Sequence, residues 1–461
     1  MITSLRIQNF KAWRDTGPLR FAPITGLFGA NSSGKSSITQ MLLMMKQTAE
    51  SPDRAQVINF GDERSYVELG SYQDIVHRGR RGDPTGDLGL SIEWSLPKPL
   101  EIRLVESPTS RTLRAAALGF ACEIGENSAK GAASLAVETF GYDLRDGSGR
   151  QLARVGMRRS QQGADLFSEG VEFKRKAGRP PRSLIPYKSY GFPDELAGVY
   201  QNVGFLNDID LEFEELFESI CYLGPLREYP RRQYIWAGGR PTDVGRRGER
   251  VVDALLASRE LGELISPGYK MRRITVEERV ARWLKTIGLI TSFRVERISP
   301  ESNLYRVRVQ TRQSSSVSLP DVGFGVSQVL PVITLCYFAP EGSIIILEQP
   351  EIHLHPRVQA ALADVLIDAV RTRGVQVIVE SHSEHLLARL QRRIAEQGIA
   401  SEDVALYFFS RGGADSHIEP LDVDTYGNIT NWPADFFGDE ISERSAMIEA
   451  TMRRLDREGP K

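Results

Sequence analysis

A glycine- and serine-rich segment near the start of the chain combines the residue types and the spacing that bind phosphate. Gly29 and Gly34 are followed by Lys35 and Ser36, which matches the pattern GxxxxGK[ST]. The glycines let backbone N–H groups curl around a β-phosphate, the lysine brings a positive charge to the β- and γ-oxygens, and the serine hydroxyl binds Mg²⁺. The segment therefore predicts a site for ATP and Mg²⁺, with the nucleotide-binding residues Gly29, Ala30, Asn31, Ser32, Ser33, Gly34, Lys35, Ser36 and Ser37.

Polar residues end an apolar segment in the last third of the chain. Ser343–Leu347 is typical of a buried strand, and Glu348, Gln349 and Glu351 follow it. Such a strand places its first polar residues at the edge of the sheet, beside a phosphate-binding loop. A carboxylate there can hold Mg²⁺ or orient the water that attacks the γ-phosphate. Together with the phosphate-binding loop, this segment predicts the catalytic edge of the same site.

Histidines stand close to this edge. A second apolar strand, Val375–Val379, leads into the segment ESHSEH, in which His382 comes just past the strand end. A ring N–H in that place can reach a γ-phosphate, so we expect His382 to act in catalysis. His385 fits a helix face better. For His353 and His355 a functional role and a packing role both stay open.

The elements that must position these groups alternate along the chain. Apolar and polar residues alternate over the N-terminal strand, whereas the helices show a helical apolar repeat. Strands that alternate with helices predict an α/β sheet core. The expected strands are Ile2–Phe10, Phe21–Phe28, Tyr305–Thr311, Ser343–Leu347 and Val375–Val379, and the expected helices are Lys35–Gln47, one from Ser327, Pro356–Arg371 and Glu384–Gln397.

The bulk composition limits the class of protein. The chain has 461 residues, of which 41% are apolar and 26% charged, and its formal net charge is −2. This length predicts two or three packed units, and the near-neutral charge restricts any nucleic-acid surface to a local patch. The three cysteines show no disulfide or zinc spacing, and the apolar segments are too short to span a membrane. We expect a cytoplasmic protein without a membrane partner.

Four motifs together resemble one family. The segments NFKAW, GANSSGKSS, LEQPEIHLHP and ESHSEHLL are similar to those of compact SMC/RecF-type ABC ATPases, above all the overcoming-lysogenization-defect-like and Septu-type ATPases of bacterial antiphage systems. The resemblance implies an α/β fold, a P-loop NTPase of the ABC type whose head carries a long mixed α/β insertion in place of a coiled coil. The expected domains are an N-terminal lobe of the head (1–80), the insertion (81–300), a C-terminal lobe (301–415) and a C-terminal extension (416–461).

The resemblance also implies roles for residues outside these motifs. Residues 321–328, DVGFGVSQ, take the place of the ABC signature, so Gly323, Gly325 and Ser327 would face the γ-phosphate of an ATP bound by a second chain. Gly323 stands where the signature usually has a serine, and whether Ser327 substitutes for that serine stays open. Gln73 is the candidate for the loop glutamine that senses Mg²⁺, with an ordinary surface turn as the alternative.

One pair of residues departs from the family pattern. The usual Asp-Glu-Pro-Glu segment places an aspartate on Mg²⁺ and a glutamate on the attacking water, and Glu348 and Gln349 hold these places here. Glu348 can still bind Mg²⁺, but a neutral amide cannot accept a proton as a general base. Either Glu351 or His382 takes part in activating the water, or ATP hydrolysis is slow. Slow hydrolysis suits a switch better than a motor. The expected catalytic residues are Glu348, Gln349, Glu351 and His382, and the expected metal-binding residues are Ser36, Gln73 and Glu348.

The expected insertion carries two basic stretches. Residues 150–188 include KRKAGRPPR, for which binding in the minor groove of A·T-rich DNA and a solvated basic loop are both open. Residues 224–248 interleave arginines with Tyr229, Tyr234 and Trp236. This pattern suits nucleic-acid contact, and it suits equally well arginines that tie the insertion to the head. The C-terminal tail is too short for a fused nuclease domain, so a separate effector protein is expected.

Three functions fit these observations. The first is an ATP-binding, slowly hydrolysing switch that forms a homodimer or higher even oligomer around ATP and controls an effector, a nuclease or toxin, in bacterial antiphage defence. The second is a RecF/SMC-like ATPase of DNA repair or maintenance, whose basic insertion holds DNA. The third is a scaffold that binds ATP without turnover, which Gln349 favours. A transporter ATPase does not fit, because such heads lack a long insertion between phosphate-binding loop and signature.

Overall fold

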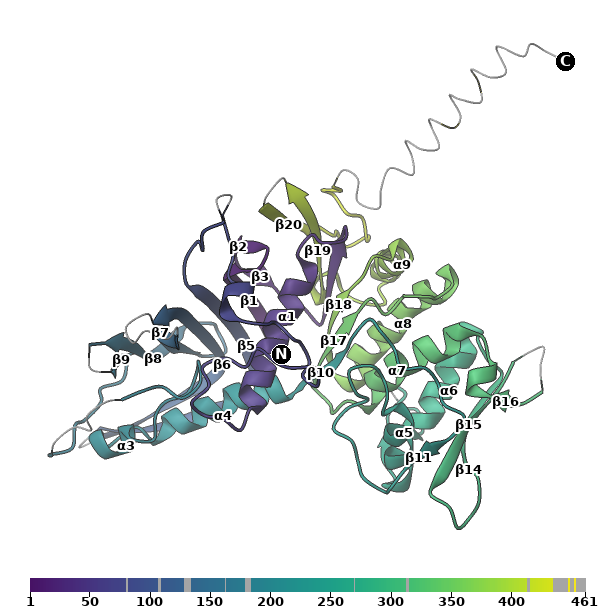
Figure 1. Cartoon of the computed structure of the whole chain (residues 1–461), viewed down its shortest axis with the longest axis horizontal. Coiled ribbons are helices and arrows are strands. Elements are labelled where there is room, and N and C mark those ends of the chain that lie inside the picture. The colour runs from purple at the N-terminus through teal and green to yellow at the C-terminus, as the bar shows by residue number, and fades with distance from the viewer. Residues whose placement is uncertain are drawn as a thin grey trace.

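The computed structural model describes residues 1–79, 82–106, 109–127, 134–161, 163–178, 184–268, 270–311, 315–412 and 415–433, together with Met447 and Met452. Two large sheets organise this part of the chain (Figure 1). A six-stranded sheet lies in the middle of the molecule, an eight-stranded antiparallel sheet extends from it on one side, and a group of helices lies on the other. Among the described helices, none is both long and apolar enough to cross a lipid bilayer.

The central sheet joins strands from distant parts of the chain. Its order is β10 (Ile220–Leu223), β17 (Ile344–Glu348), β18 (Gln376–Glu380), β4 (Ile24–Gly29), β19 (Val404–Gly412) and β20 (Asp415–Leu421). All neighbours are parallel except β19 and β20. Strand β18 lies between β4 and β17, and because the three strands are parallel, their carboxyl ends meet at one edge of the sheet.

Helices cover both faces of this sheet. Alternate residues of β17 belong to two different cores: Ile344 and Ile346 share one with α1 (Lys35–Glu50), whereas Ile345 and Leu347 share the other with three later helices. Strands buried on both faces are continuously apolar, and β17 begins with three isoleucines. The three later helices are α7 (Phe324–Phe338), α8 (Pro356–Arg373) and α9 (Glu384–Ala395).

The antiparallel sheet begins with the N-terminal strands. Helix α4 (Gly204–Glu218) covers it and packs Phe213 against Trp94, Phe120 and Tyr142, with ring centroids 4.6 to 6.2 Å apart. Two short helices, α2 (Tyr72–Ile75) and α3 (Leu196–Val199), complete this part. The strands are β1 (Ile2–Phe10), β2 (Trp13–Asp15), β3 (Leu19–Arg20), β5 (Leu88–Glu106), β6 (Thr109–Asn127), β7 (Ser134–Arg145), β8 (Gln151–Ser160) and β9 (Gly163–Glu169).

Smaller elements surround α7. Helix α6 starts with a capping box, in which the Thr275 hydroxyl accepts from the backbone N–H of Glu278 at 3.1 Å. Two short 3₁₀ turns cover residues 319–321 and 401–403. The other elements are α5 (Val251–Glu260), α6 (Val276–Ile287), β11 (Tyr234–Ile235), β12 (Leu264–Ile265), β13 (Ile274–Thr275), β14 (Ser292–Arg297), β15 (Leu304–Gln310) and β16 (Val317–Ser318).

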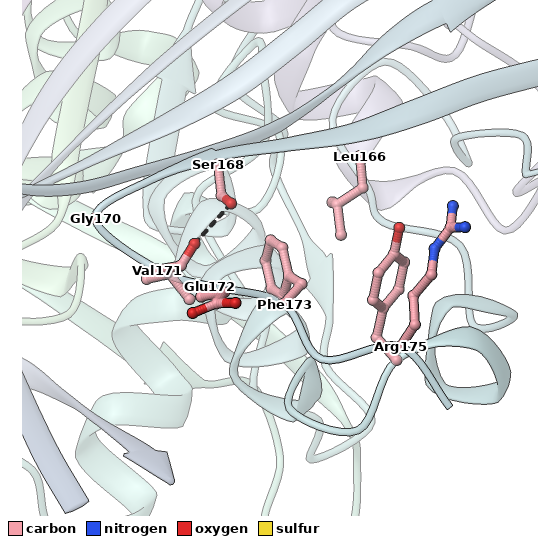
Figure 2. Close-up of a pocket in the computed structure, with 8 residues that line it drawn as sticks. Leu166, Ser168, Gly170, Val171, Glu172, Phe173 and Arg175 are labelled. Carbon is pink, nitrogen blue, oxygen red and sulfur yellow. Dashed lines mark hydrogen bonds between the residues drawn. The ribbon is translucent and has the colours of Figure 1, made fainter. Parts of the chain in front are cut away.

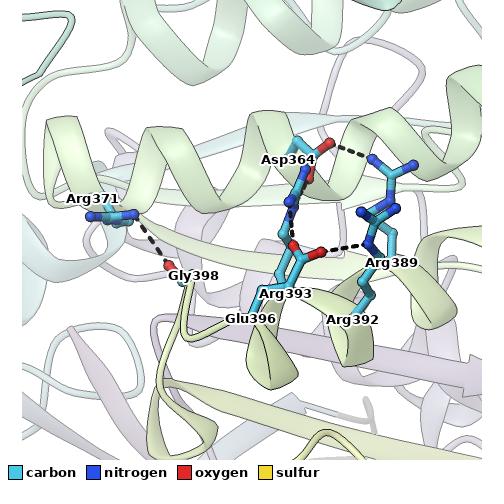
Figure 3. Close-up of polar contacts among 7 residues, drawn as sticks. All are labelled: Asp364, Arg371, Arg389, Arg392, Arg393, Glu396 and Gly398. Carbon is cyan, nitrogen blue, oxygen red and sulfur yellow. Dashed lines mark hydrogen bonds and ion pairs between the residues drawn. The ribbon is translucent and has the colours of Figure 1, made fainter.

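A polar clamp joins α8 to α9. Asp364 accepts hydrogen bonds from Arg389 at 2.5 Å and from Arg393 at 2.6 Å (Figure 3). Helix α8 begins shortly after Glu351, and α9 begins two residues after His382. The clamp therefore holds in place the two helices that follow the loops of the catalytic edge.

Most of the expected elements are present within a few residues. The strand Ile2–Phe10 is confirmed, and α1 runs three residues beyond the expected helix Lys35–Gln47. The expected insertion, 81–300, contributes to both large sheets, because β5 to β9 continue the sheet that β1 begins and β10 pairs with β17. The domain boundaries stay a prediction, although β10 precedes the expected C-terminal lobe and lies inside the central sheet.

Replacing Asp210 on α4 with asparagine is expected to stabilise the protein at alkaline pH. Its Oδ2 accepts from the Tyr187 hydroxyl at 3.1 Å and the Phe192 N–H at 3.0 Å, while Oδ1 is buried and has no hydrogen-bond partner within the described part of the chain. Burial raises the pKa of Asp210 well above its usual value, more than these hydrogen bonds lower it. The folded state thus binds this proton more tightly than the unfolded state, and stability falls as pH rises above about 4.

The measurement is denaturant unfolding at pH 8 and pH 4. The neutral amide avoids a buried charge, so the free energy of unfolding should rise by about 1–3 kcal/mol at pH 8 and by less at pH 4. Asp208→Asn, at an exposed position on the same helix, is the control and should change neither value. An equal effect of Asp210→Asn at both pH values would contradict the buried-charge explanation.

Candidate functional site

The phosphate-binding loop connects β4 to α1, and two glycines shape it. Gly29 has φ 136°, and a Cβ there would lie 2.1 Å from the carbonyl oxygen of Phe409. Gly34 has φ 95°, and a Cβ there would lie 2.8 Å from the ring of Trp13, whose Nε1 donates to the Gly34 carbonyl at 3.0 Å. Glycine at both positions therefore lets the loop take this conformation and pack closely against Phe409 and Trp13.

The ammonium group of Lys35 lies inside this loop. Its Nζ donates to the carbonyl oxygens of Gly29 at 2.9 Å and Ala30 at 2.6 Å, and the side chain is buried. Burial lowers the pKa of Lys35, and the carboxylates of Glu380 and Glu351 oppose that shift. The structure thus places a cation where a β- or γ-phosphate would need one.

Three glutamates gather at the carboxyl edge of the sheet. Glu348 ends β17 and Glu380 ends β18, and the two are paired in register. The Ser36 hydroxyl donates to Glu380 Oε1 at 3.0 Å, while Glu348 accepts from Thr39 at 2.8 Å. Glu351 follows β17 and its Oε1 accepts the backbone N–H of His382 at 2.6 Å. The carboxylate beside Ser36 is therefore Glu380.

Burial dominates the proton affinity of this acidic cluster. It raises the pKa of Glu380 to about 7, with Glu348 as the next cause. Burial also raises the pKa values of Glu348 and Glu351. Arg227, in the segment that follows β10, is buried as well and its charge lowers both values. Its Nε and Nη1 have no hydrogen-bond partner in the described structure.

A cavity of about 270 Å³ opens over the phosphate-binding loop. It brings together residues from both ends of the chain, as the sequence predicts. Glu348 and Glu351, two of the expected catalytic residues, do not line it. The lining consists of Lys11, Ala12, residues 31–37, Gln349, Glu380 and His382.

A second cavity of about 540 Å³ adjoins the first. The two share Lys11, Ala12 and Ser32, and Gln73 lines the second. The Gln73 amide nitrogen donates to Glu126 at 2.6 Å, its amide oxygen accepts from Arg78 at 3.1 Å, and Gln73 does not line the first cavity.

The expected signature segment lies apart from this cavity. Gly323 precedes α7, and the Ser327 hydroxyl donates to the Phe324 carbonyl at 2.8 Å. Gly323, Gly325 and Ser327 do not line the phosphate cavity of their own chain.

The four candidate histidines have different surroundings. His382 lines the phosphate cavity, and burial, together with the charge of Lys35, lowers its pKa, so it is neutral at pH 7. The ring of His353 meets that of Phe324 edge-on at 5.3 Å. His355 caps α8 by accepting from the Arg357 N–H at 3.3 Å, which is a structural role. His385 lies on α9 as expected, 3.7 Å from Glu384.

Glu380 and Arg227 lie at this edge of the sheet but are not among the residues expected from the sequence. The rule that selected Glu348, the first polar residue after an apolar strand, also selects Glu380 after residues 375–379. Arg227 carries no such local signal, because its burial depends on the pairing of β10 with β17.

The two basic stretches contact their own chain where they are described. Beside β9 lies an open hollow of about 670 Å³ (Figure 2), where Arg175 lies over the Tyr200 ring at 5.9 Å. Residues 179–182 of the string KRKAGRPPR lie outside the described residues. In the second stretch, Arg232 pairs with Asp321 at 2.7 Å, and Arg246 donates to the Glu63 carbonyl. These arginines tie residues 224–248 to the head.

The donor set fits ATP with Mg²⁺. The loop offers backbone N–H groups and a buried lysine to the phosphates, and Ser36 with Glu380 offers oxygen atoms, which Mg²⁺ prefers. Within the described residues no cluster of three His, Cys, Asp or Glu side chains could hold a metal ion. A Mg²⁺ ion that draws most of its ligands from phosphates and water needs no such cluster.

The glycine-shaped loop, its buried lysine and the carboxylates of a parallel sheet define a P-loop NTPase, and the α/β fold predicted from the sequence is confirmed. The model of the family described as "AAA domain, putative AbiEii toxin, Type IV TA system" matches residues 144–388, more than half of the chain. The chain belongs to this family and is a P-loop ATPase. The match includes β17 and β18 but begins after the phosphate-binding loop. A second model, "Protein of unknown function (DUF3696)", matches residues 399–443.

Solved SMC heads are similar to the whole chain at low identity. The SMC head bound to the C-winged helix domain of ScpA is 11% identical, with 92% of this chain and 98% of that chain covered and a TM-score of 0.48. The SMC head with an extended coiled coil from Pyrococcus furiosus, bound to the C-terminal domain of ScpA, is 10% identical, with 98% of this chain and 99% of that chain covered and a TM-score of 0.45. The SMC head domain from Thermotoga maritima is 12% identical, with 92% of this chain and 99% of that chain covered and a TM-score of 0.41. No curated protein sequence matches significantly.

Proposed function

We propose that this ATPase is a slow switch of the overcoming-lysogenization-defect-like and Septu-type group. Two chains close around ATP, and the closed state controls a separate effector, a nuclease or toxin, in antiphage defence. The observation that carries the proposal is the phosphate cavity, which joins the loop at residues 31–37 to Gln349, Glu380 and His382 but lacks the signature segment. The family description, which names a putative toxin of a type IV toxin–antitoxin system, supports the role in defence.

The signature segment is open to a second chain. No described atom lies within 4 Å of the position that a Cβ would take on Gly323, and the next residue, Phe324, is 42% exposed. The first N–H groups of a helix have no partner within the helix and carry a partial positive charge, so the N-terminus of α7 suits a γ-phosphate. An ATP bound on one chain would thus complete its contacts on the other.

ATP with Mg²⁺ is expected to shift the protein from monomer to dimer, because only the closed pair contacts each nucleotide from both sides. Gly323→Glu should weaken the ATP-induced dimer by more than about tenfold through like-charge repulsion of the γ-phosphate, and should leave ATP binding to the monomer intact. Gly239→Glu, another position with open space around its Cβ, is the matched control. Analytical ultracentrifugation with and without ATP measures both variants.

A species that stays monomeric at every ATP concentration would refute nucleotide-linked dimerisation. A dimer that forms without ATP through another surface would still allow the heads to close. In that case Gly323→Glu should abolish the ATP-dependent change in sedimentation coefficient and leave the dimer in place.

A scaffold that binds ATP without turnover is the second candidate. Gln349 favours it, because this neutral amide lines the phosphate cavity where the family usually has a glutamate. The rate of ATP hydrolysis separates the two candidates, since a switch must reset and a scaffold need not.

A further inference from the structure

We infer that Glu380, rather than Glu348, supplies the carboxylate that holds Mg²⁺ together with Ser36 when ATP is bound. This inference rests on the proposed ATP site and assigns one ligand within it. The observation behind it is the position of β18, which lies between the strand of the phosphate-binding loop and the strand of Glu348.

The register of the sheet sets the reach of the two carboxylates. Glu348 and Glu380 are paired at the ends of neighbouring strands, but only β18 also pairs with β4, which leads into the loop. Glu380 is therefore one strand closer to Ser36, whose hydroxyl donates to its Oε1 at 3.0 Å. Glu380 lines the phosphate cavity, and Glu348 does not.

The hydrogen bonds of the two carboxylates also favour Glu380 over Glu348 as the metal ligand. Glu348 has both oxygens engaged, Oε1 with the Thr39 hydroxyl at 2.8 Å and Oε2 with the Tyr222 hydroxyl at 3.2 Å. Glu380 is only 3% exposed, and its Oε2 has no hydrogen-bond partner among the residues that the structure describes. A buried carboxylate oxygen without a partner is costly, and a cation in the cavity removes that cost.

The chemistry of Mg²⁺·ATP fits one such carboxylate. Mg²⁺ in phosphate sites binds one or two protein carboxylates together with phosphate oxygens and waters. The Ser36 hydroxyl donates its hydrogen bond to Glu380, which leaves the lone pairs of the Ser36 oxygen available to bind the metal. Without a cation between them, a carboxylate in this cavity would repel the triphosphate. The position of Glu380 is therefore favourable for ATP binding only when a metal ion is present.

The first test measures metal binding directly. Mn²⁺ replaces Mg²⁺, the protein is saturated with a non-hydrolysable ATP analogue, and electron paramagnetic resonance follows free Mn²⁺. Glu380→Gln should weaken Mn²⁺ binding by at least about tenfold, whereas Glu348→Gln should have a smaller effect. Glu384→Gln, an exposed glutamate at the start of α9, is the matched control and should bind Mn²⁺ like the wild type. Thermal unfolding confirms that each variant is folded.

The second test measures ATP binding in EDTA by calorimetry. Glu380→Gln should bind metal-free ATP as tightly as the wild type or more tightly, because a negative charge beside the phosphates is gone. Three results would overturn the inference: unchanged Mn²⁺ affinity in Glu380→Gln, a larger loss in Glu348→Gln, or weaker metal-free ATP binding in Glu380→Gln, which would mark a purely structural residue. Failure of the wild type to bind ATP with or without metal would instead refute the proposed site itself, and this inference with it.

Discussion

Lys35→Ala is expected to abolish detectable ATP binding while the protein stays folded. The Lys35 ammonium now donates to the carbonyls of Gly29 and Ala30, and bound phosphates would replace these weaker acceptors. Two charge-assisted hydrogen bonds contribute about 1.5–3 kcal/mol each, so their loss lowers the affinity by roughly 10²–10⁴-fold. Isothermal titration calorimetry with ATP measures this loss.

Lys46→Ala provides the matched control, because Lys46 is also a buried lysine of α1. Its Nζ pairs with Glu50 at 2.7 Å and donates to the Phe217 carbonyl, away from the phosphate cavity. This variant should lose stability but keep its affinity for ATP. Unchanged ATP affinity in folded Lys35→Ala protein would refute the assignment of the phosphate-binding loop.

Gln349→Glu is expected to raise the rate of ATP hydrolysis by as much as about 10²–10⁴-fold, the usual contribution of a general base. Gln349 lines the phosphate cavity, and its backbone N–H donates to the Glu380 carbonyl at 2.8 Å, which fixes its place at the sheet edge. A glutamate there adds a proton acceptor beside the attacking water without a change in side-chain size. Steady-state phosphate release of the purified protein measures the rate, which should be low in the wild type.

The controls for turnover use the neighbouring groups. Gln397→Glu makes the same change at an exposed glutamine that also has a positive φ, 58° against 45° at Gln349, and should leave the rate unchanged. Glu351→Gln and His382→Ala should remove the residual wild-type activity that these groups support. Fast wild-type hydrolysis that is indifferent to both changes would place the catalytic group elsewhere.

The local part of the site could be predicted from the sequence. The loop from Gly29 to Ser36 has a fixed spacing, and the strand before it and the helix after it are set by apolar patterns of neighbouring residues. Strands β17 and β18 could also be predicted, because a continuous apolar segment indicates a strand buried on both faces. The parallel arrangement of the strands predicted that the phosphate-binding loop and the polar residues after β17 and β18 would meet at one edge of the sheet.

The rest depends on strand order, which a sequence pattern does not contain. Nothing local to Ile220–Leu223 indicates that β10 pairs with β17 across more than a hundred residues of chain. The order also decides which carboxylate meets Ser36: β18 separates β17 from β4, so the Ser36 hydroxyl donates to Glu380 and not to Glu348. The burial of Arg227 near Glu348 and Glu351 could not be predicted for the same reason.

The position of β18 beside β4 also constrains how the protein is made. Strand β4 is synthesised before its two neighbours: β18 leaves the ribosome about 350 residues later, and β19 later still. At roughly 5–20 residues per second, the nascent chain waits some 20–70 s with β4 unpaired. Even Ile2 bonds to the side chain of Gln376, at 2.8 Å. The phosphate cavity can therefore form only after β18 has left the ribosome, and a chain that stops before β18 lacks Glu380 and His382 and exposes apolar surface on which chaperones act.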